Sequence, residues 1–149
     1  MVKNIRLIFV YIININAYYK NKKRWGKMNI ETERLKLIGV NSEENKNIRK
    51  NICAKNWDII LKGSKIGRID FVLMDDEYQV NMFIDEKHRD EGYGSEALTE
   101  IVKELYKTND FLKVSAKVND NNAAMARVLV KSGFYYDENE DLYEYRYQK

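Results

Sequence analysis

An apolar stripe of helical spacing lies between two strand-like segments in the middle of the chain, and it restricts the fold more than any other feature. The stripe runs through residues 94–107. Its members recur every three or four residues, as on one face of a helix; they are Ala97, Leu98, Ile101, Val102 and Leu105. Residues 77–85 and 111–119 on either side alternate apolar and polar side chains, as strands do. This order predicts a right-handed crossover between two parallel strands.

Further strands are predicted on both sides of this unit. Residues 33–40 alternate with Leu35 and Leu37 on one face, and residues 57–74 are typical of a hairpin that turns at Gly63-Ser64. Two aromatic-rich strands flank an acidic turn at 137–141. In the strand at 77–85, the side chains of one face are Tyr78, Val80, Met82 and Ile84. In the strand at 111–119, Lys113, Ser115 and Lys117 alternate with apolar residues.

Two more helices are expected. Asn41 and Glu44 resemble a capping box that opens a short polar helix to about Lys55. A second helix runs from Asn122 to Ser132 and ends at Gly133, a residue suited to the left-handed position after a helix. The predicted class is α+β, with a mixed, mostly antiparallel sheet, a parallel fourth and fifth strand, and helices on both faces.

The first 27 residues differ in composition from the rest. They contain seven Lys or Arg residues and no Asp or Glu. Taking these seven charges from the net charge of +3 leaves −4 for residues 28–149, which argues against a nucleic-acid partner. The apolar run Leu7–Ile13 is too short to span a bilayer. We hypothesise that Met28 is the native start and that residues 1–27 are a leader that is not translated or not ordered; a weak membrane anchor is the alternative.

Cysteine and histidine each occur once, as Cys53 and His88. One cysteine excludes an internal disulfide and favours a reducing, cytoplasmic location, where we expect Cys53 to be a small buried residue on a helix. One histidine and one cysteine leave no cluster of the usual metal ligands, so we expect no catalytic metal. Because the run Leu7–Ile13 is too short to span a bilayer, we expect no membrane partner either.

The segment from Arg89 to Ser95 carries the strongest chemical signal. Gly92 and Gly94 stand two apart just where a strand gives way to the predicted helix. Glycines let the backbone approach a ligand, and the first turn of a helix has unpaired N–H groups, so the segment predicts a phosphate or pyrophosphate site. It is not a P-loop, because no Gly-Lys-Ser/Thr follows, and it lacks the third glycine of a dinucleotide fingerprint.

Arg89-x-x-Gly92-x-Gly94 resembles the acetyl-CoA signature of the GNAT N-acetyltransferases. The flanking sequence is most similar to the branch that acetylates the N-termini of ribosomal proteins, the RimJ/RimL-like branch. Glu31–Leu37 resembles the opening strand of that branch, and Asn122–Phe134 resembles its second cofactor helix. The resemblance implies a GNAT-type fold over residues 28–149, with the helices on the acceptor side shortened.

The resemblance also implies which residues bind acetyl-CoA as co-substrate. The main chain of Met82, Phe83 and Ile84 is expected to pair with the pantetheine arm. The pyrophosphate is expected on the backbone of the segment comprising Arg89, Asp90, Glu91, Gly92, Tyr93, Gly94 and Ser95. Asn122 is implied to bond the cofactor arm, although it is equally typical of a helix N-cap, and Arg127 is implied to reach the phosphates, although a solvent-exposed helix residue is the simpler interpretation.

The implied reaction is direct attack of a neutral primary amine on the thioester, which requires a base. The candidates are Tyr78, at the aligned position, and Glu77 beside it, which is the better base chemically but is also typical of a solvated turn. The family's usual hydroxyl acids are replaced by Leu129 and Met125, so Tyr135 or Tyr136 would have to substitute.

The sequence leaves the acceptor open. It could be a protein N-terminus, a polyamine or another small amine, and a homodimer is compatible with the chain. The alternative function is a CoA-binding or regulatory module of the same fold with impaired catalysis.

Overall fold

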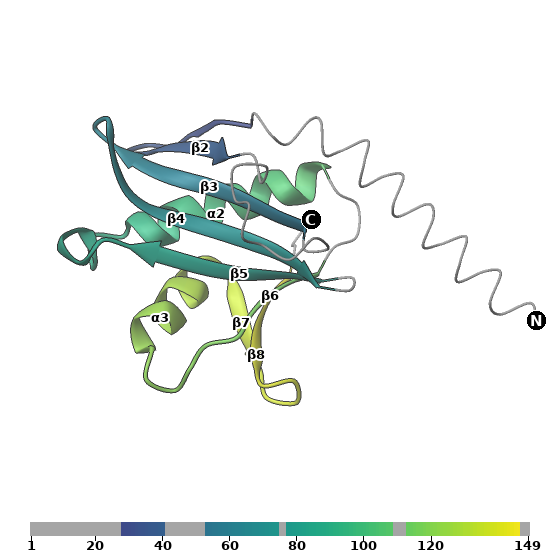
Figure 1. Ribbon diagram of the computed structural model, residues 1–149. Helices are drawn as coiled ribbons and strands as arrows, with labels where there is room; N and C mark the ends of the chain where they lie inside the picture. Colours follow the sequence, from purple (N-terminus) through teal and green to yellow (C-terminus); the bar gives the residue numbers. More distant parts are fainter. Residues whose placement is uncertain (1–27, 41–52, 75–76, 109–112, 147–149) are drawn as a thin grey trace, which may run out of the picture.

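The computed structural model describes residues 28–40, 53–74, 77–108 and 113–146. Eight strands form one sheet in the order β1-β2-β3-β4-β5-β6-β8-β7, shown in Figure 1. The strands span Ile30–Glu31, Lys36–Val40, Cys53–Leu61, Ser64–Met74, Glu77–Ile84, Lys113–Ala116, Phe134–Asp137 and Leu142–Tyr145 for β1 to β8. Helix α2 spans Tyr93–Thr108, α3 spans Ala123–Lys131, and the short 3₁₀ helix η2 spans Glu86–His88. The mixed α+β architecture is therefore confirmed.

All neighbouring strands are antiparallel except β5 and β6, which are parallel and are joined through α2. This is the crossover that the stripe in residues 94–107 predicts. The β3–β4 hairpin turns at Lys62-Gly63, one residue earlier than expected, and both residues have positive φ angles, 49° and 82°. Two positive φ angles in a two-residue loop match the right-handed twist of the flanking strands.

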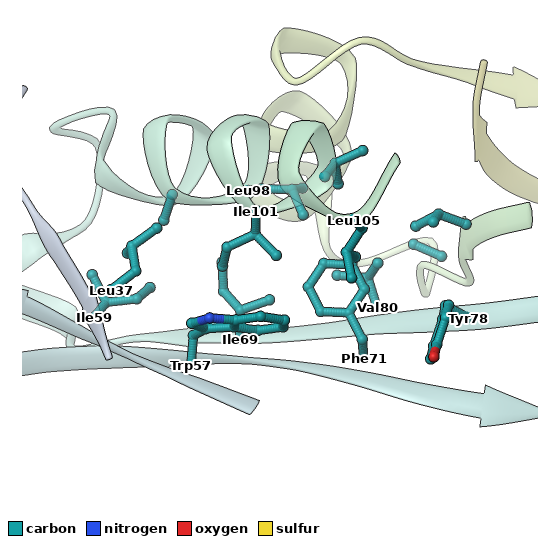
Figure 2. Close-up of a cluster of buried hydrophobic side chains, with 14 of the residues drawn as sticks. Leu37, Trp57, Ile59, Ile69, Phe71, Tyr78, Val80, Leu98, Ile101 and Leu105 are labelled. Atoms are coloured by element: carbon teal, nitrogen blue, oxygen red, sulfur yellow. The ribbon is translucent and has the colours of Figure 1, made fainter. Parts of the chain in front are cut away.

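The core lies between α2 and one face of the sheet. Leu98, Ile101 and Leu105 of α2 face the apolar side chains of β3 and β4, as Figure 2 shows. Trp57 and Phe71 meet there edge to face, with ring centroids 5.7 Å apart. Because these side chains are almost fully buried, burial of apolar surface holds α2 against the sheet.

Helix α3 lies on the same face as α2. The Oγ atom of Ser132, at its end, donates to the carbonyl of Ser95, and Leu129 is fully buried in the common core. Across the part of the chain that the structure describes, the opposite face carries no helix. The helix predicted from Asn41 lies mostly outside the described residues, so helices on both faces remain a prediction.

One expectation needs correction. The helix predicted from Asn41 cannot reach Lys55, because Cys53–Lys55 already belong to β3, so Cys53 lies on a strand. Ser115 alternates with apolar residues and is itself fully buried, between Gln79 and Glu144 on the neighbouring strands. Among the described helices, none is long and apolar enough to cross a membrane.

Candidate active site

Strands β5 and β6 part soon after they meet. Their register runs only from Glu77↔Lys113 to Gln79↔Ser115. The rest of β5, from Val80 to Ile84, pairs with β4 alone among the described residues. A strand that lacks a neighbour presents a row of N–H and C=O groups to any extended ligand. The second half of β5 therefore offers an open edge.

The pairing with β4 shows which residues of β5 face this opening. A Cβ atom on Gly67 would lie 2.3 Å from the carbonyl oxygen of Phe83, so that carbonyl points toward β4. Main-chain groups alternate in direction along a strand. The N–H and C=O of Met82 therefore face the opening, and those of Phe83 do not. Phe83 is 57% exposed.

Ile84 is engaged by its own loop. The Nε atom of Arg89 donates to the Ile84 carbonyl at 2.9 Å, and the Arg89 guanidinium lies 5.9 Å from the centre of the Phe83 ring. The Arg89 side chain thus folds back over the end of β5. This leaves the backbone of the loop, rather than the arginine side chain, to meet an anion.

The loop at residues 89–92 has the backbone of an anion site. Asp90 and Gly92 have positive φ angles of 61° and 83°, a conformation that favours glycine at the second position. The N–H of Glu96 donates to the Gly92 carbonyl. Among the described residues, no hydrogen bond engages the N–H groups of residues 90–95. These groups and the positive end of the α2 dipole together can hold a phosphate.

Gly94 marks where three elements converge. A Cβ atom at Gly94 would lie 3.1 Å from the Sδ of Met82 on β5 and 3.7 Å from a methyl group of Val128 on α3. The start of α2 therefore lies against the open half of β5. A ligand with both an amide-bearing arm and a phosphate group fits this arrangement, because strand edge and helix start are neighbours.

Asn122 and Arg127 lie on α3. The Oδ1 of Asn122 accepts the N–H of Met125 at 3.1 Å, so Asn122 is the N-cap of the helix. Its amide group stays available as a donor, since the cap uses only the oxygen. Arg127 is exposed on the same helix.

The two candidate bases lie on opposite faces of β5. Tyr78 is in the core, 3% exposed, with the Nζ of Lys55 4.8 Å from its ring centre. This position keeps Tyr78 away from an acceptor. Glu77 points to the other face, where its Oε1 is buried and has no hydrogen-bond partner among the described residues. Its Oε2 lies 3.8 Å from Lys113, which also lies 3.5 Å from Glu144.

Tyr135 and Tyr136, the candidates to replace the family's usual acid, are poorly suited to donate a proton. Leu129, at the position of that acid, is fully buried in the core. The phenol of Tyr136 donates to Asp141 at 2.5 Å, which raises the pKa of Tyr136 to about 12. Burial raises the pKa of Tyr135. Both phenols are therefore weaker proton donors than an ordinary tyrosine.

Sequence reasoning missed one group at this site, the side chain of Arg34. Its Nε donates to Glu96 Oε2 at 2.7 Å, and its Nη1 donates to the carbonyl of Glu91 at 2.9 Å. Its guanidinium also lies 4.5 Å from the centre of the Tyr93 ring. The only signal in the sequence was the resemblance of the segment around Arg34 to a family strand, which says nothing of a contact with residues 91–96.

Glu96 completes this group. Besides Arg34 Nε, its carboxylate accepts the N–H of Arg34 at 2.8 Å and the hydroxyl of Thr32 at 2.5 Å. Partial burial raises the pKa of Glu96, but the hydrogen bonds from Thr32 and Arg34 outweigh it, so the pKa lies below the ordinary value. A lowered pKa stabilises the fold above the ordinary carboxyl pKa, and this stability is lost as the pH falls through the lowered value.

The fold, with its parted parallel strand pair and glycine-bearing helix start, is that of one class of acyltransferase. The Acetyltransferase (GNAT) domain model matches residues 15–135. The chain belongs to the GNAT acetyltransferase family, whose members use acetyl-CoA. No curated protein sequence is significantly similar to the chain.

Solved structures of acetyltransferases have the same fold. A GNAT-family acetyltransferase of Bacillus anthracis is 23% identical, with a TM-score of 0.60, covering 74% of this chain and 85% of that chain. A candidate ribosomal-protein-serine acetyltransferase of Vibrio cholerae is 12% identical over the same shares, with a TM-score of 0.60. The aminoglycoside acetyltransferase AAC(6')-Ib, solved with coenzyme A and kanamycin, is 15% identical, with a TM-score of 0.51, covering 56% of this chain and 57% of that chain. At these identities the likeness concerns the fold alone.

Proposed function

We propose that the chain transfers the acetyl group of acetyl-CoA to a primary amine by direct attack. One observation carries the proposal: the open half of β5 lies beside a helix start with unengaged N–H groups. The first feature suits the amides of a pantetheine arm, and the second suits a pyrophosphate. Acetyl-CoA has both groups on one molecule.

Main-chain contacts would hold the acyl donor. Met82 presents its N–H and C=O to the arm, residues 89–95 present their N–H groups to the pyrophosphate, and the Asn122 amide donates from the other side. An N–H near Met82 would polarise the thioester carbonyl and stabilise the developing negative charge. Arg127 is exposed and contributes at most to the phosphates.

The proton of the acceptor is assigned to Glu77. A protonated amine is not nucleophilic, so it must lose a proton before its nitrogen attacks the carbonyl carbon. The nitrogen–carbon bond forms and the carbon–sulfur bond breaks. The thiolate leaves as CoA after taking up the second proton, which the nitrogen loses on forming the amide. The Glu77 side chain is 25% exposed, unlike the buried Tyr78, and its carboxylate would accept the proton released by the amine.

The acceptor belongs to the class of primary amines. Protein N-termini, polyamines and small amines remain the candidates to be screened. The resemblance to ribosomal-protein acetyltransferases makes an N-terminal peptide the first compound to test.

A second function is favoured by a specific observation. Leu129 fills the core where the family often has an acid, and Tyr135 and Tyr136 have raised pKa values. A chain without an acid would bind CoA and turn over slowly, as a regulatory module does. Binding of acetyl-CoA without thiol release for any amine would support this second function.

The test is calorimetric titration of the full chain with acetyl-CoA, with two glycine variants. Gly92→Glu places a carboxylate in the loop and should weaken binding at least about tenfold, which corresponds to about 1.4 kcal/mol. Gly63→Glu is the matched control: Gly63 has nearly the same φ, 82° against 83°, but nothing lies within 4 Å of its Cβ position. The two variants carry similar backbone strain, so a loss of acetyl-CoA binding in Gly92→Glu but not in Gly63→Glu supports the proposal. Failure of the unaltered chain to bind acetyl-CoA contradicts it.

A further inference from the structure

Arg34 reaches the cofactor loop from a segment that is remote in sequence. It precedes β2, which three strands separate from β6 in the sheet. Its guanidinium nevertheless contacts the carbonyl of Glu91 and the carboxylate of Glu96. The two contacts lie at 2.9 Å and 2.7 Å and come from different nitrogens of one planar group. A guanidinium held at two points is fixed in orientation as well as in place.

The contact with Glu91 sets the direction of a peptide group. In a trans peptide the C=O and the following N–H point in opposite directions. Because the Glu91 carbonyl points to Arg34, the N–H of Gly92 points away from it. A peptide flip at this position would turn a carbonyl toward the anion and the N–H away from it.

The contact with Glu96 keeps Arg34 in position. The carboxylate receives the Arg34 Nε and main-chain N–H together with the Thr32 hydroxyl. The Glu96 side chain is 16% exposed and that of Arg34 is 41% exposed, so the pair is partly shielded from water. A Cβ atom on Gly92 would lie 3.3 Å from Arg34 Nη2, which shows how closely the side chain follows the loop.

We infer that Arg34 is a positioning residue for the acyl donor: it fixes the peptide between Glu91 and Gly92 so that the Gly92 N–H is presented to the pyrophosphate. The inference rests on the proposed function, and it makes Thr32 and Glu96 the support of that arginine. Arg34 does not touch the reacting atoms, and its positive charge is largely matched by Glu96. Its effect is therefore confined to the part of the ligand that carries the pyrophosphate.

The ligand pair CoA and pantetheine isolates this effect, since pantetheine lacks the pyrophosphate and the nucleotide. Calorimetric titration of the full-length Arg34→Met variant should show the affinity for CoA weakened about tenfold. A loss of this size is expected when a hydrogen bond from a charged group is removed. The affinity for pantetheine should change by less than about twofold, because a substitution remote from the pantetheine site has only a small effect there. Arg34→Lys keeps the charge but not the two-point contact, and it should weaken CoA binding as well.

Arg68→Met is the matched control. Arg68 lies on β4, and its Nε pairs with Asp70 at 3.0 Å and Asp58 at 4.0 Å, so the variant also loses a sheet arginine with acidic partners. It should leave both affinities unchanged. Circular dichroism of each variant shows whether it folds. If Arg34→Met does not fold, the binding data of Arg34→Lys test the inference.

The outcomes separate the inference from the function on which it rests. If the unaltered chain binds no CoA, the proposed function fails. If the chain binds CoA and the folded Arg34 variants bind it equally well, the inference alone fails. Equal weakening of CoA and pantetheine would also overturn it, because that pattern indicates a general structural role.

Discussion

Helices α2 and α3, both within the described residues, begin in different ways. Helix α3 starts with a side-chain cap, in which Asn122 accepts the N–H of Met125. Helix α2 follows a loop with two positive φ angles, and a distant arginine holds a carbonyl of that loop. A cap satisfies the helix from within its own sequence, whereas the N–H groups at the start of α2 have no partner among the described residues. The difference is what the proposed function requires, with the start of α3 serving mainly stability and the start of α2 serving binding.

The largest expected effect tests whether the catalytic base lies on β5, the strand that leads into α2. Glu77→Gln on β5 should lower kcat about 100-fold, because the amine loses its proton acceptor. The apparent KM for acetyl-CoA should stay the same, since residues 82–95 are unaltered. The measurement is thiol release with the best amine acceptor found by screening.

Glu144→Gln is the control for Glu77. Glu144 lies on β8, after α3, and is the other carboxylate near Lys113, at 3.5 Å. Its substitution removes the same charge from the same lysine. Equal losses of kcat in the two variants would contradict the assignment of Glu77 as the base. The region before α2 would then be no more important for catalysis than the region after α3.

The next effect compares an added carboxylate at each helix start. A carboxylate in the first turn normally stabilises a helix by about 0.3–1 kcal/mol. Ala124→Asp on α3 should therefore raise the melting temperature slightly and leave acetyl-CoA binding unchanged. Ser95→Asp on α2 should weaken acetyl-CoA binding about tenfold or more, because the new charge competes with the phosphates. Similar affinities of the two variants in calorimetry would show that α2 is not the anion site.

These outcomes depend on features that the sequence predicts unequally. The stripe in residues 94–107 locates α2 to within one residue at each end, because five buried side chains repeat with the helical period. The glycines of the loop predict an anion site for a similar local reason. The alternation that puts Tyr78 on the same face as Val80 agrees with the burial of both side chains in the core.

The role of Arg34 could not be predicted in this way. It contacts Glu96, 62 residues later in the chain, and a contact between distant segments leaves no periodic trace in either of them. The extent of the helix proposed from Asn41 was misjudged, since a polar segment carries weak periodicity and β3 begins within it.

The smallest effect sharpens the comparison at α3. Asn122→Ala should cost about 1 kcal/mol of folding free energy, as expected for the loss of an N-cap. Asn122→Asp keeps an oxygen for Met125 but has no amide donor, so it should retain stability and weaken acetyl-CoA binding a few-fold. Unaltered affinity of this variant in calorimetry would mean that Asn122 is a cap alone.

The contact between Arg34 and the loop also bears on the order of events during synthesis and folding. Thr32 and Arg34 leave the ribosome long before Glu91 and Glu96, and the intervening segment must close on itself before they meet. Closing so long a loop is entropically costly and slow compared with forming a helix. Helix α2 can therefore form early, while its loop acquires the final peptide orientation only after the meander β2–β5 is assembled. The capacity to hold acetyl-CoA would then appear late in folding and report that the sheet is complete.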